Sequence, residues 1–296
     1  MLLSLGAFDT SAMAPRKKTA TVRIGSYNLR RGEITEKNPE NNWDQRKDRT
    51  VQSFLSCNFD ICGLQEVDSV QQADVLNMLE SAGTPYDGFF FCPYADDGRG
   101  SKAHGIIWRK DRFVLEGEPH RFWLSDPPEV KQVNDHGGNG KGKYIRGASC
   151  AILRDIRDGR RYFIMATHAP LSKEDHAAAA HVCADMERLY NPSGYPSFFV
   201  GDFNALETDA SSAEYRKWWA DTYRSFDSTP ELRTGPEGTF NSWRLGRTPT
   251  KRIDFIYFRG AGVTPVSYRC DDTLYDGLLP SDHFPIYADF LIGPDR

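Results

Sequence analysis

From residue 21 onward, the chain alternates short apolar, β-rich runs with a few helical stretches. Nine runs carry the Val, Ile, Phe and Tyr enrichment and the turn boundaries that are typical of strands. They span residues 21–29, 60–67, 87–92, 104–109, 146–155, 161–168, 197–203, 252–258 and 284–292. Apolar residues recur three and four positions apart in four other segments, which predicts helices over 44–56, 69–82, 173–190 and 207–220. Asp44 and Ser69 are the predicted N-caps of the first two helices.

Strands outnumber helices in both halves of the chain, and no Pro-, Gly- or Ser-rich linker separates the halves. We therefore predict one α/β domain over residues 21–296, with two packed sheets and helices outside, preceded by a disordered or targeting tail over residues 1–20. The segment 125–145 is long and rich in Gly, Pro, Asn and Lys. Long ordered loops tend to be functional or mobile, so this loop is predicted to border a site.

Composition excludes several classes of protein. The chain has 296 residues, 39% of them hydrophobic, which is enough for a sizeable core. No run approaches the about 18 apolar residues of a membrane span, so we expect no membrane insertion. The net charge of −4 argues against binding nucleic acid by bulk charge alone. Six scattered cysteines without a C-x-x-C pair predict buried, reduced thiols, which are typical of an intracellular protein. We expect a cytoplasmic monomer, with nuclear or organellar targeting left open.

Polar residues stand at strand ends where a buried-strand pattern should stay apolar. They occupy residues 26–28, 65–66, 167–168, 201–204 and 281–283, and a sixth segment, 252–255, places Asp254 inside a run that should be buried on both faces. One such carboxylate is usually structural, because it caps a helix or pairs with an arginine. Six segments of this kind favour a single shared site where the strand ends meet.

The residue types in these segments narrow the chemistry. The set comprises the acids Glu66, Asp202, Asp254 and Asp282, the histidines His168 and His283, and the asparagines Asn28 and Asn204. Oxygen donors without cysteine suit Mg²⁺ or Mn²⁺ better than zinc. Asparagine donates hydrogen bonds to phosphoryl oxygens, and histidine transfers protons near neutral pH. Together they predict metal-assisted attack of water on a phosphate ester.

Six motifs carry a resemblance to a known family. The segments SYNL, LQEV, THAP, GDFN, RIDFIYF and SDHFPI resemble, in this order, those of the endonuclease/exonuclease/phosphatase superfamily, from residue 21 to about 292. The segment RFWLS at 121–125 resembles a largely uncharacterised branch that has a WLS motif. The resemblance implies the DNase-I-like fold, which is a four-layered α/β sandwich of two mixed, mostly antiparallel sheets with helices outside.

The resemblance also implies a role for each residue. Glu66 is expected to be the principal ligand of Mg²⁺, or of Mn²⁺, with Asn28 and Asp282 close to the ion or its waters. The expected catalytic residues are His168, Asp202, Asn204, Asp254 and His283. In this scheme Asp202 orients or deprotonates the attacking water, and Asn204 contacts a phosphoryl oxygen. His283, held by Asp254, acts as base or stabilises developing charge, and His168 contacts the phosphate and protonates the leaving oxygen.

One departure concerns the segment before the strand at 104–109. Members of this superfamily often carry a glutamate there, whereas this chain has Ser101, Lys102, Ala103 and His104. Either Lys102 or His104 then faces the substrate, or the segment is an exposed loop.

The substrate class stays open between a phosphodiesterase or phosphatase, a nuclease acting on DNA or RNA, and a non-catalytic phosphate-binding module. Basic clusters at Arg30 and Arg31, at Lys141, Lys143 and Arg146, and at Arg244, Arg247, Lys251 and Arg252 either bind phosphate or are solvated loop charge. Phe240 and Trp243 either stack on a base or pack against the sheet. The predicted substrate-binding set is Arg30, His104, Arg146, Trp243 and Arg252.

Overall fold

The computed structural model describes residues 19–94, 102–131 and 145–294. One sheet has the strand order β10-β12-β13-β1-β2-β4-β3, and the other has the order β5-β6-β7-β8-β11-β9. The first sheet contains β1 (Ala20–Asn28), β2 (Ile61–Val67), β3 (Tyr86–Phe91), β4 (Ala103–Arg109), β10 (Arg233–Thr234), β12 (Val263–Cys270) and β13 (Ile286–Ile292). The second contains β5 (Phe113–Trp123), β6 (Gly147–Asp155), β7 (Arg161–His168), β8 (Ser197–Asp202), β9 (Ala220–Asp221) and β11 (Asp254–Arg259).

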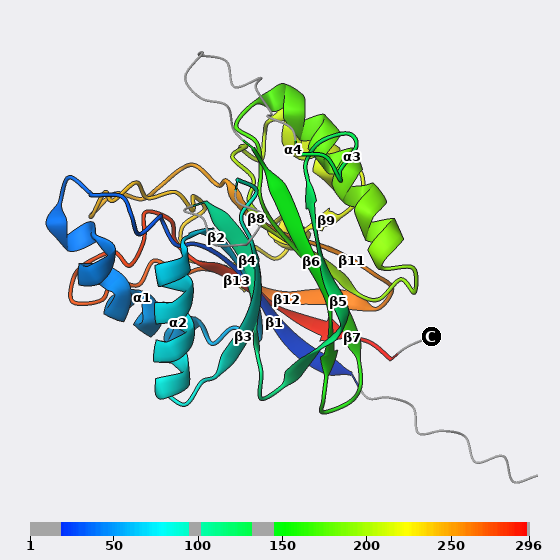
Figure 1. The fold of residues 1–296 in the computed structure, drawn as a ribbon, viewed down its shortest axis with the longest axis horizontal. Helices are drawn as coiled ribbons and strands as arrows, with labels where there is room; N and C mark the ends of the chain where they lie inside the picture. Colours follow the sequence, from blue (N-terminus) through cyan, green and yellow to red (C-terminus); the bar gives the residue numbers. More distant parts are fainter. Residues whose placement is uncertain (1–18, 95–101, 132–144, 295–296) are drawn as a thin grey trace, which may run out of the picture.

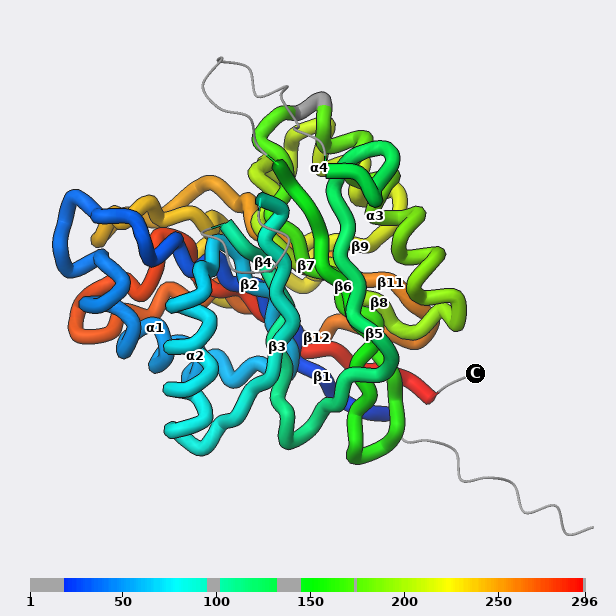
Figure 2. Tube along the Cα trace, in the orientation of Figure 1, coloured from blue at the N-terminus to red at the C-terminus, as the bar shows by residue number. Residues whose placement is uncertain are grey.

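Four α-helices within the described residues cover the outer faces of the sheets (Figure 1). They are α1 (Trp43–Cys57), α2 (Ser69–Ser81), α3 (Lys173–Tyr190) and α4 (Ala210–Arg216). One hydrophobic cluster fills the space between the sheets, and two others lie under α1 and α2 and under α3 and α4. The layers follow one another in the trace of Figure 2. The predicted four-layered sandwich is therefore confirmed, and most strand pairs are antiparallel.

The strand register brings the polar strand ends to one edge. Asn28 of β1 pairs with Gln65 of the parallel strand β2, and His168 of β7 pairs with Asp202 of the parallel strand β8. The antiparallel strand β11 begins at Asp254, opposite Asp202. The two sheets come close behind these ends, because a Cβ on Gly63 would meet the Val200 side chain at 2.3 Å.

Most predicted elements are present with similar bounds, but the N-caps of two helices and the length of a third differ. The predicted N-caps Asp44 and Ser69 are wrong. Asn42 precedes α1, and Asp68 caps α2 by accepting hydrogen bonds from backbone N–H groups in the first turn. The helix predicted over 207–220 shortens at both ends to α4, and the last residue of that range, Ala220, already begins β9.

Four strands were not predicted. Two of them, β9 and β10, have only two residues each, and the other two, β5 and β12, both contain a proline. β5 includes Pro119, and its pairing with β6 shifts between Glu116 and His120. β12 includes Pro265, and its pairing with β13 shifts there. Proline cannot donate to the sheet and is confined to edges and bulges, so these segments lack a regular strand pattern.

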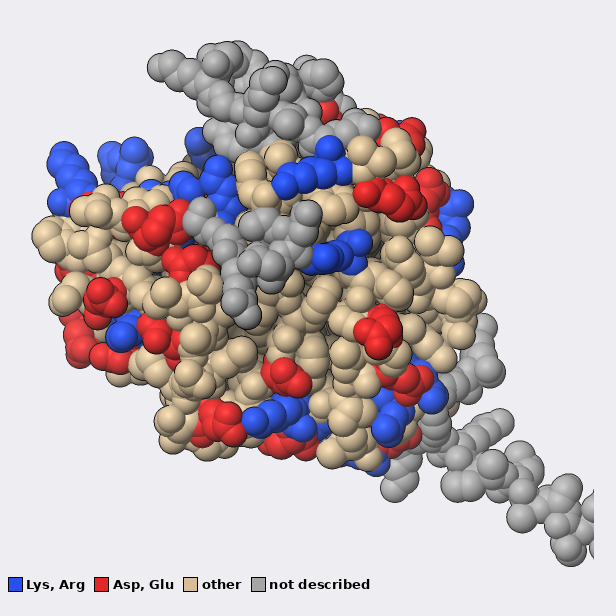
Figure 3. Space-filling view, viewed as in Figure 1, with Lys and Arg blue, Asp and Glu red and all other residues tan. Residues whose placement is uncertain are grey.

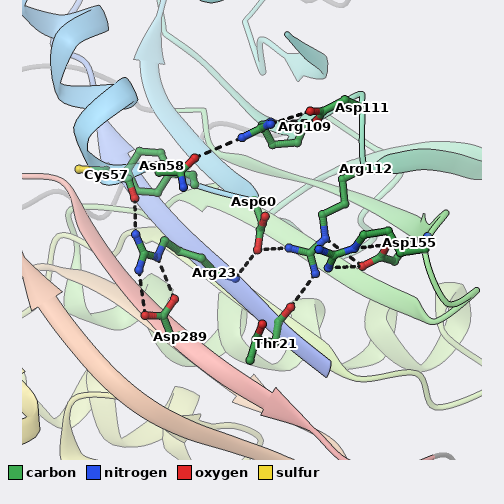
Figure 4. Close-up of polar contacts among 12 residues, drawn as sticks. Thr21, Arg23, Cys57, Asn58, Asp60, Arg109, Asp111, Arg112, Asp155 and Asp289 are labelled. Atoms are coloured by element: carbon green, nitrogen blue, oxygen red, sulfur yellow. Dashed lines mark hydrogen bonds and ion pairs between the residues drawn. The ribbon is translucent and has the colours of Figure 1, made fainter. Parts of the chain in front are cut away.

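The sheet ends far from the polar edge carry a paired ionic network (Figure 4). Arg23 donates to both carboxylate oxygens of Asp289, at 2.8 and 3.0 Å. Arg112 lies between Asp155 and Asp60. Burial opposes ionisation of Asp289, but the hydrogen bond from Arg23 outweighs it and lowers the pKa of this carboxyl. The arginines and carboxylates at this end of the sheets are therefore paired with groups of opposite charge.

The predicted tail over residues 1–20 lies outside the described residues except for its last two, and Ala20 already begins β1. Most of the predicted loop 125–145, with Lys141 and Lys143, also lies outside them. None of the described helices is long and apolar enough to cross a membrane.

Candidate active site

A hollow of about 530 Å³ opens where the carboxyl ends of β1, β2, β7 and β8 meet. Asn28 and Asp254 are buried and do not line the hollow themselves. Each is bonded to a residue that does, Asn28 to Asp202 and Asp254 to His283. The predicted residues that line it are Arg30, Glu66, Arg146, His168, Asp202, Asn204, Asp282 and His283. The eight residues predicted to bind metal or catalyse are thus brought together from segments that span the chain.

His283 is held by a buried carboxylate. Its Nδ1 lies 2.8 Å from Oδ2 of Asp254, and the same oxygen accepts a short hydrogen bond from the Thr239 hydroxyl. Burial favours the neutral imidazole, but the charge of Asp254 and its hydrogen bond outweigh this effect and raise the pKa of His283 to about 10. The geometry fixes the ring so that Nε2 faces Asp202, at 3.8 Å.

Asp202 is the centre of the site. Its Oδ2 accepts a hydrogen bond from Nδ2 of Asn28 at 3.0 Å, and its Oδ1 accepts one from the backbone N–H of Asn204 at 2.9 Å. Nε2 of His168 lies 3.4 Å from Oδ2. Burial raises the pKa of Asp202 to about 7, and the nearby charge of Asp254 adds to this effect. A carboxyl that titrates near neutral pH is suited to accept a proton.

His168 is in a different electrostatic setting from His283. Burial, followed by the positive charges of Arg146 and His283, lowers the pKa of His168 well below its ordinary value. The two histidines therefore differ in charge at neutral pH, with His168 neutral and His283 protonated.

Three carboxylate oxygens at this edge have no hydrogen-bond donor among the described residues. They are Oε2 of Glu66, Oδ1 of Asp254 and Oδ1 of Asp282, and all three atoms are buried. Arginine contacts to Glu66 and Asp282 are long, at 3.7 Å in each case. Burial, and then the charge of Glu66, raise the pKa of Asp282, opposite to the direction at Asp289 in the paired network (Figure 4). Buried oxygens of this kind fit a divalent cation.

The donors allow two positions for such a cation. One ligand atom from each of Asp202, Asp254 and His283 lies within 4.8 Å of the other two. However, Nδ1 of His283 and Oδ2 of Asp254 already bond to each other. Asp254 keeps one donor-free oxygen, but its other oxygen is bonded to His283 and Thr239. Glu66 and Asp282 have donor-free oxygens and no such bond among the described residues, so we favour the position beside these two residues.

The backbone is strained at three positions around the hollow. Arg30, Glu66 and Asn204 have φ values of 54°, 53° and 51°, a region that non-glycine residues seldom adopt. At Glu66 the pairing of β2 with β4 shifts between Leu64 and Val67. A bulge at a strand end re-aims a side chain, here that of Glu66 into the hollow. Strain of this kind clusters at functional sites.

The sequence model of the endonuclease/exonuclease/phosphatase family matches residues 25–283, which include all these side chains. The chain belongs to this family. Proteins of the family are phosphoester hydrolases. No curated protein sequence matches the chain.

Solved structures share this family fold over nearly their whole length. A family protein from Bacteroides thetaiotaomicron is 24% identical over 93% of this chain and 99% of that one, with a TM-score of 0.79. The mannosyl-6-phosphatase Bt3783 of the same organism is 25% identical over 91% and 99%, with a TM-score of 0.75. TDP2 of D. rerio with a single-strand DNA product is 19% identical over 92% and 99%, with a TM-score of 0.66, which shows the fold alone.

Three of the five predicted substrate-binding residues do not line the active-site hollow. His104 is buried against Phe91, and burial lowers its pKa to about 3. Trp243 packs against the core between the sheets, 5.5 Å from the Arg46 guanidinium. Arg252 is 3% exposed and is turned into the interior.

Arg252 was expected to contact the substrate, but it makes structural contacts in the interior. Its guanidinium bonds both carboxylate oxygens of Asp221, at 3.1 and 2.8 Å, and also reaches Glu207. It lies between the rings of Tyr223 and Phe255, at 4.5 and 4.3 Å. Arg252 and Lys251 are neighbours just before β11, and their side chains point to opposite sides of the chain. Of these two, only Lys251 lines the hollow.

We expect Arg252→Met to lower the free energy of unfolding by about 3–5 kcal/mol, because breaking a buried ion pair leaves the Asp221 charge unpaired. Arg247→Met is the matched control, since Arg247 lies in the same loop, is exposed and has no carboxylate partner among the described residues. Urea denaturation of both variants measures the difference. Normal stability of Arg252→Met together with weakened substrate binding would restore the substrate-contact interpretation.

Sequence reasoning missed several residues of the site. Thr239 holds Asp254 from a segment without strand or helix pattern, so no sequence signal identifies it. Arg31 and Lys102 line the hollow. Both are basic residues near motifs, but the predicted substrate-binding set leaves them out. Of Lys102 and His104, the structure brings Lys102 to the hollow. The hollow is also lined by four apolar side chains, those of Leu171, Leu206, Phe240 and Ile253.

Proposed function

We propose that this chain is a divalent-metal-dependent hydrolase of phosphate esters, a phosphodiesterase or phosphatase that uses Mg²⁺, with Mn²⁺ as the alternative. One observation carries the proposal. Buried carboxylate oxygens without donors, on Glu66 and Asp282, lie in the same hollow as the His283–Asp254 pair and as Asp202. Cation ligands, a proton acceptor and an oriented imidazole are what hydrolysis of a phosphate ester requires.

Glu66 and Asp282, with Asn28 nearby, hold the metal in this proposal, and the bound metal supplies neutralisation of phosphoryl charge. Asp202 accepts the proton of the attacking water, since its pKa of about 7 suits this step. Asn28 and the backbone of Asn204 fix the orientation of that carboxylate.

The remaining groups act on the phosphate. His283 is protonated at neutral pH, which favours stabilisation of developing charge over action as a base. His168 is neutral and contacts the phosphate as a hydrogen-bonding group. Asn204 donates one amide hydrogen to the carbonyl of Ala169 at 3.0 Å, which orients the other for a phosphoryl oxygen. Arg30 and Arg146 supply positive charge at the wall of the hollow.

The runner-up functions are a nuclease and a non-catalytic binding module. The named phosphatase among the similar structures supports a hydrolase of small phosphate esters. A binding module has no need for a buried carboxylate bonded to a histidine that faces a second carboxylate, so the Asp254–His283–Asp202 arrangement favours an enzyme. All six cysteines are buried and free of disulfides, which supports an intracellular, cytoplasmic location.

The test is a hydrolysis panel with Mg²⁺, with Mn²⁺ and with EDTA. It contains p-nitrophenyl phosphate, bis-p-nitrophenyl phosphate, sugar phosphates, single- and double-stranded DNA, and RNA. We expect one class to be cleaved with metal, cleavage to stop in EDTA, and activity to return when metal is added back. Turnover that is insensitive to EDTA would contradict the proposal. Tight metal binding without turnover of any substrate would support the binding module.

A further inference from the structure

A second hollow, of about 330 Å³, adjoins the active-site hollow and shares Phe240 and Lys251 with it. Among the described residues, its lining contains no carboxylate. Three cations line it, with hydroxyl groups between them: Arg244, Arg247, Lys251, Ser242, Thr248 and Thr250. Lys and Arg side chains project from the upper left edge of the molecule in Figure 3, where Figure 1 shows the gold-orange loop. A hollow of this volume, lined by positively charged side chains, fits an anionic group.

The loop that forms this hollow is fastened to the catalytic segment. Backbone N–H groups of Asn241 and Ser242 donate to the carbonyl of Asp282, at 2.9 and 3.0 Å. The Asn241 side chain donates to the carbonyl of Ser281 at 3.1 Å and accepts from the N–H of Trp243. Ser242 and Trp243 are both held at positive φ. The loop therefore has a defined position relative to Asp282.

Arg244 and Arg247 differ from the other arginines of the described residues. Every other described arginine has a carboxylate, carbonyl, aromatic or other polar partner. The side chains of Arg244 and Arg247 have no hydrogen bond or ion pair among these residues, and both are exposed. Neither is thus committed to the fold, whereas their neighbour Arg252 is.

We propose that Arg244 and Arg247, with Lys251, form a subsite for a second phosphate group of the substrate. The inference rests on the proposed function, because the first phosphate is the one hydrolysed beside Glu66 and Asp282. Phe240 stands at the junction of the two hollows, with its ring 4.9 Å from that of His283. The organic group that connects the two phosphates lies over this ring.

Two sources supply such a second phosphate, and paired substrates distinguish them. One pair is a dinucleotide with and without a 5′-phosphate, and the other is a sugar bisphosphate and its monophosphate. We expect the wild type to prefer the two-phosphate member of one pair by about tenfold or more in kcat/KM, as for charge-assisted hydrogen bonds. The double variant Arg244→Ala/Arg247→Ala should lose this preference.

Arg188→Ala/Lys217→Ala is the matched control. Both residues are exposed cations on or beside α3 and α4. Each forms an i,i+3 ion pair, and Arg188 also lies over the ring of Trp218. The control should keep the wild-type preference. A wild type without preference in either pair, or a double variant that keeps it, would overturn the subsite.

Failure of the proposed function gives a different result, namely no metal-dependent turnover of any of the four compounds by the wild type. In that case the same compounds are titrated into the protein with Mg²⁺ by calorimetry. Binding of a two-phosphate compound that is about tenfold tighter in the wild type, and not in the double variant, supports the subsite without catalysis. Equal affinities in both proteins contradict it.

Discussion

Glu66→Gln is expected to lower kcat/KM for a cleaved phosphate ester about 10³-fold, which corresponds to the several kcal/mol of charge stabilisation that a metal supplies. Glutamine has the same shape but no charge, so the strained backbone at this position is kept. The protein should stay folded, because Oε2 of Glu66 has no hydrogen-bond donor to lose among the described residues. The change therefore tests the metal site and leaves the fold unaltered.

A second measurement separates metal binding from catalysis. Mg²⁺ at about 100 times its Kd stabilises a folded protein by about 2.7 kcal/mol, so it raises the Tm of the wild type. We expect Glu66→Gln to lose most of this rise and to bind Mn²⁺ more weakly in electron paramagnetic resonance titrations. Glu33→Gln is the control, since Glu33 contacts the same arginine, Arg31, but is more exposed and does not line the hollow. Equal metal affinity in wild type and Glu66→Gln would remove Glu66 from the metal site.

The sequence predicts the layers of this fold well, because each strand with regular apolar residues is buried between a sheet and a helical layer. β5 and β12 escape prediction because proline interrupts both at bulges. The helix cap at Asp68 escapes it because the capping side chain precedes the apolar repeat by one residue more than expected. Irregular positions of this kind are fixed by tertiary contacts, which a periodic pattern does not encode.

The residues of the site also divide into those that the sequence identifies and those that it does not. Residues that end a strand, such as Asn28, His168 and Asp202, are identifiable, because a polar side chain breaks an apolar run there. Thr239 is not identifiable, since it reaches Asp254 from a loop across 15 residues. Arg252 was assigned to the substrate from its charge and position, and only the Asp221 pairing shows that it belongs to the interior.

Asp254→Asn is expected to lower kcat about 10²–10⁴-fold, the range for loss of acid–base or charge stabilisation by a positioned group. Asp254 fixes the ring of His283 through Nδ1 and keeps its imidazolium stable. An asparagine amide can present either its oxygen or its N–H₂ to that nitrogen, so it no longer specifies the ring's proton or orientation. Substrate affinity should change much less than kcat, because Asp254 does not line the hollow.

The pH–rate profile distinguishes this role from a structural one. The negative charge of Asp254 raises the pKa of His283 to about 10, so removing the charge lowers that pKa. If protonated His283 is the active form, the alkaline limb of the Asp254→Asn profile moves to lower pH. Asp221→Asn breaks a buried ion pair beside the same strand β11, so it should lower stability and leave the limb in place. An unmoved limb in Asp254→Asn would show that Asp254 only supports the fold, and His283 would then need another source of its charge.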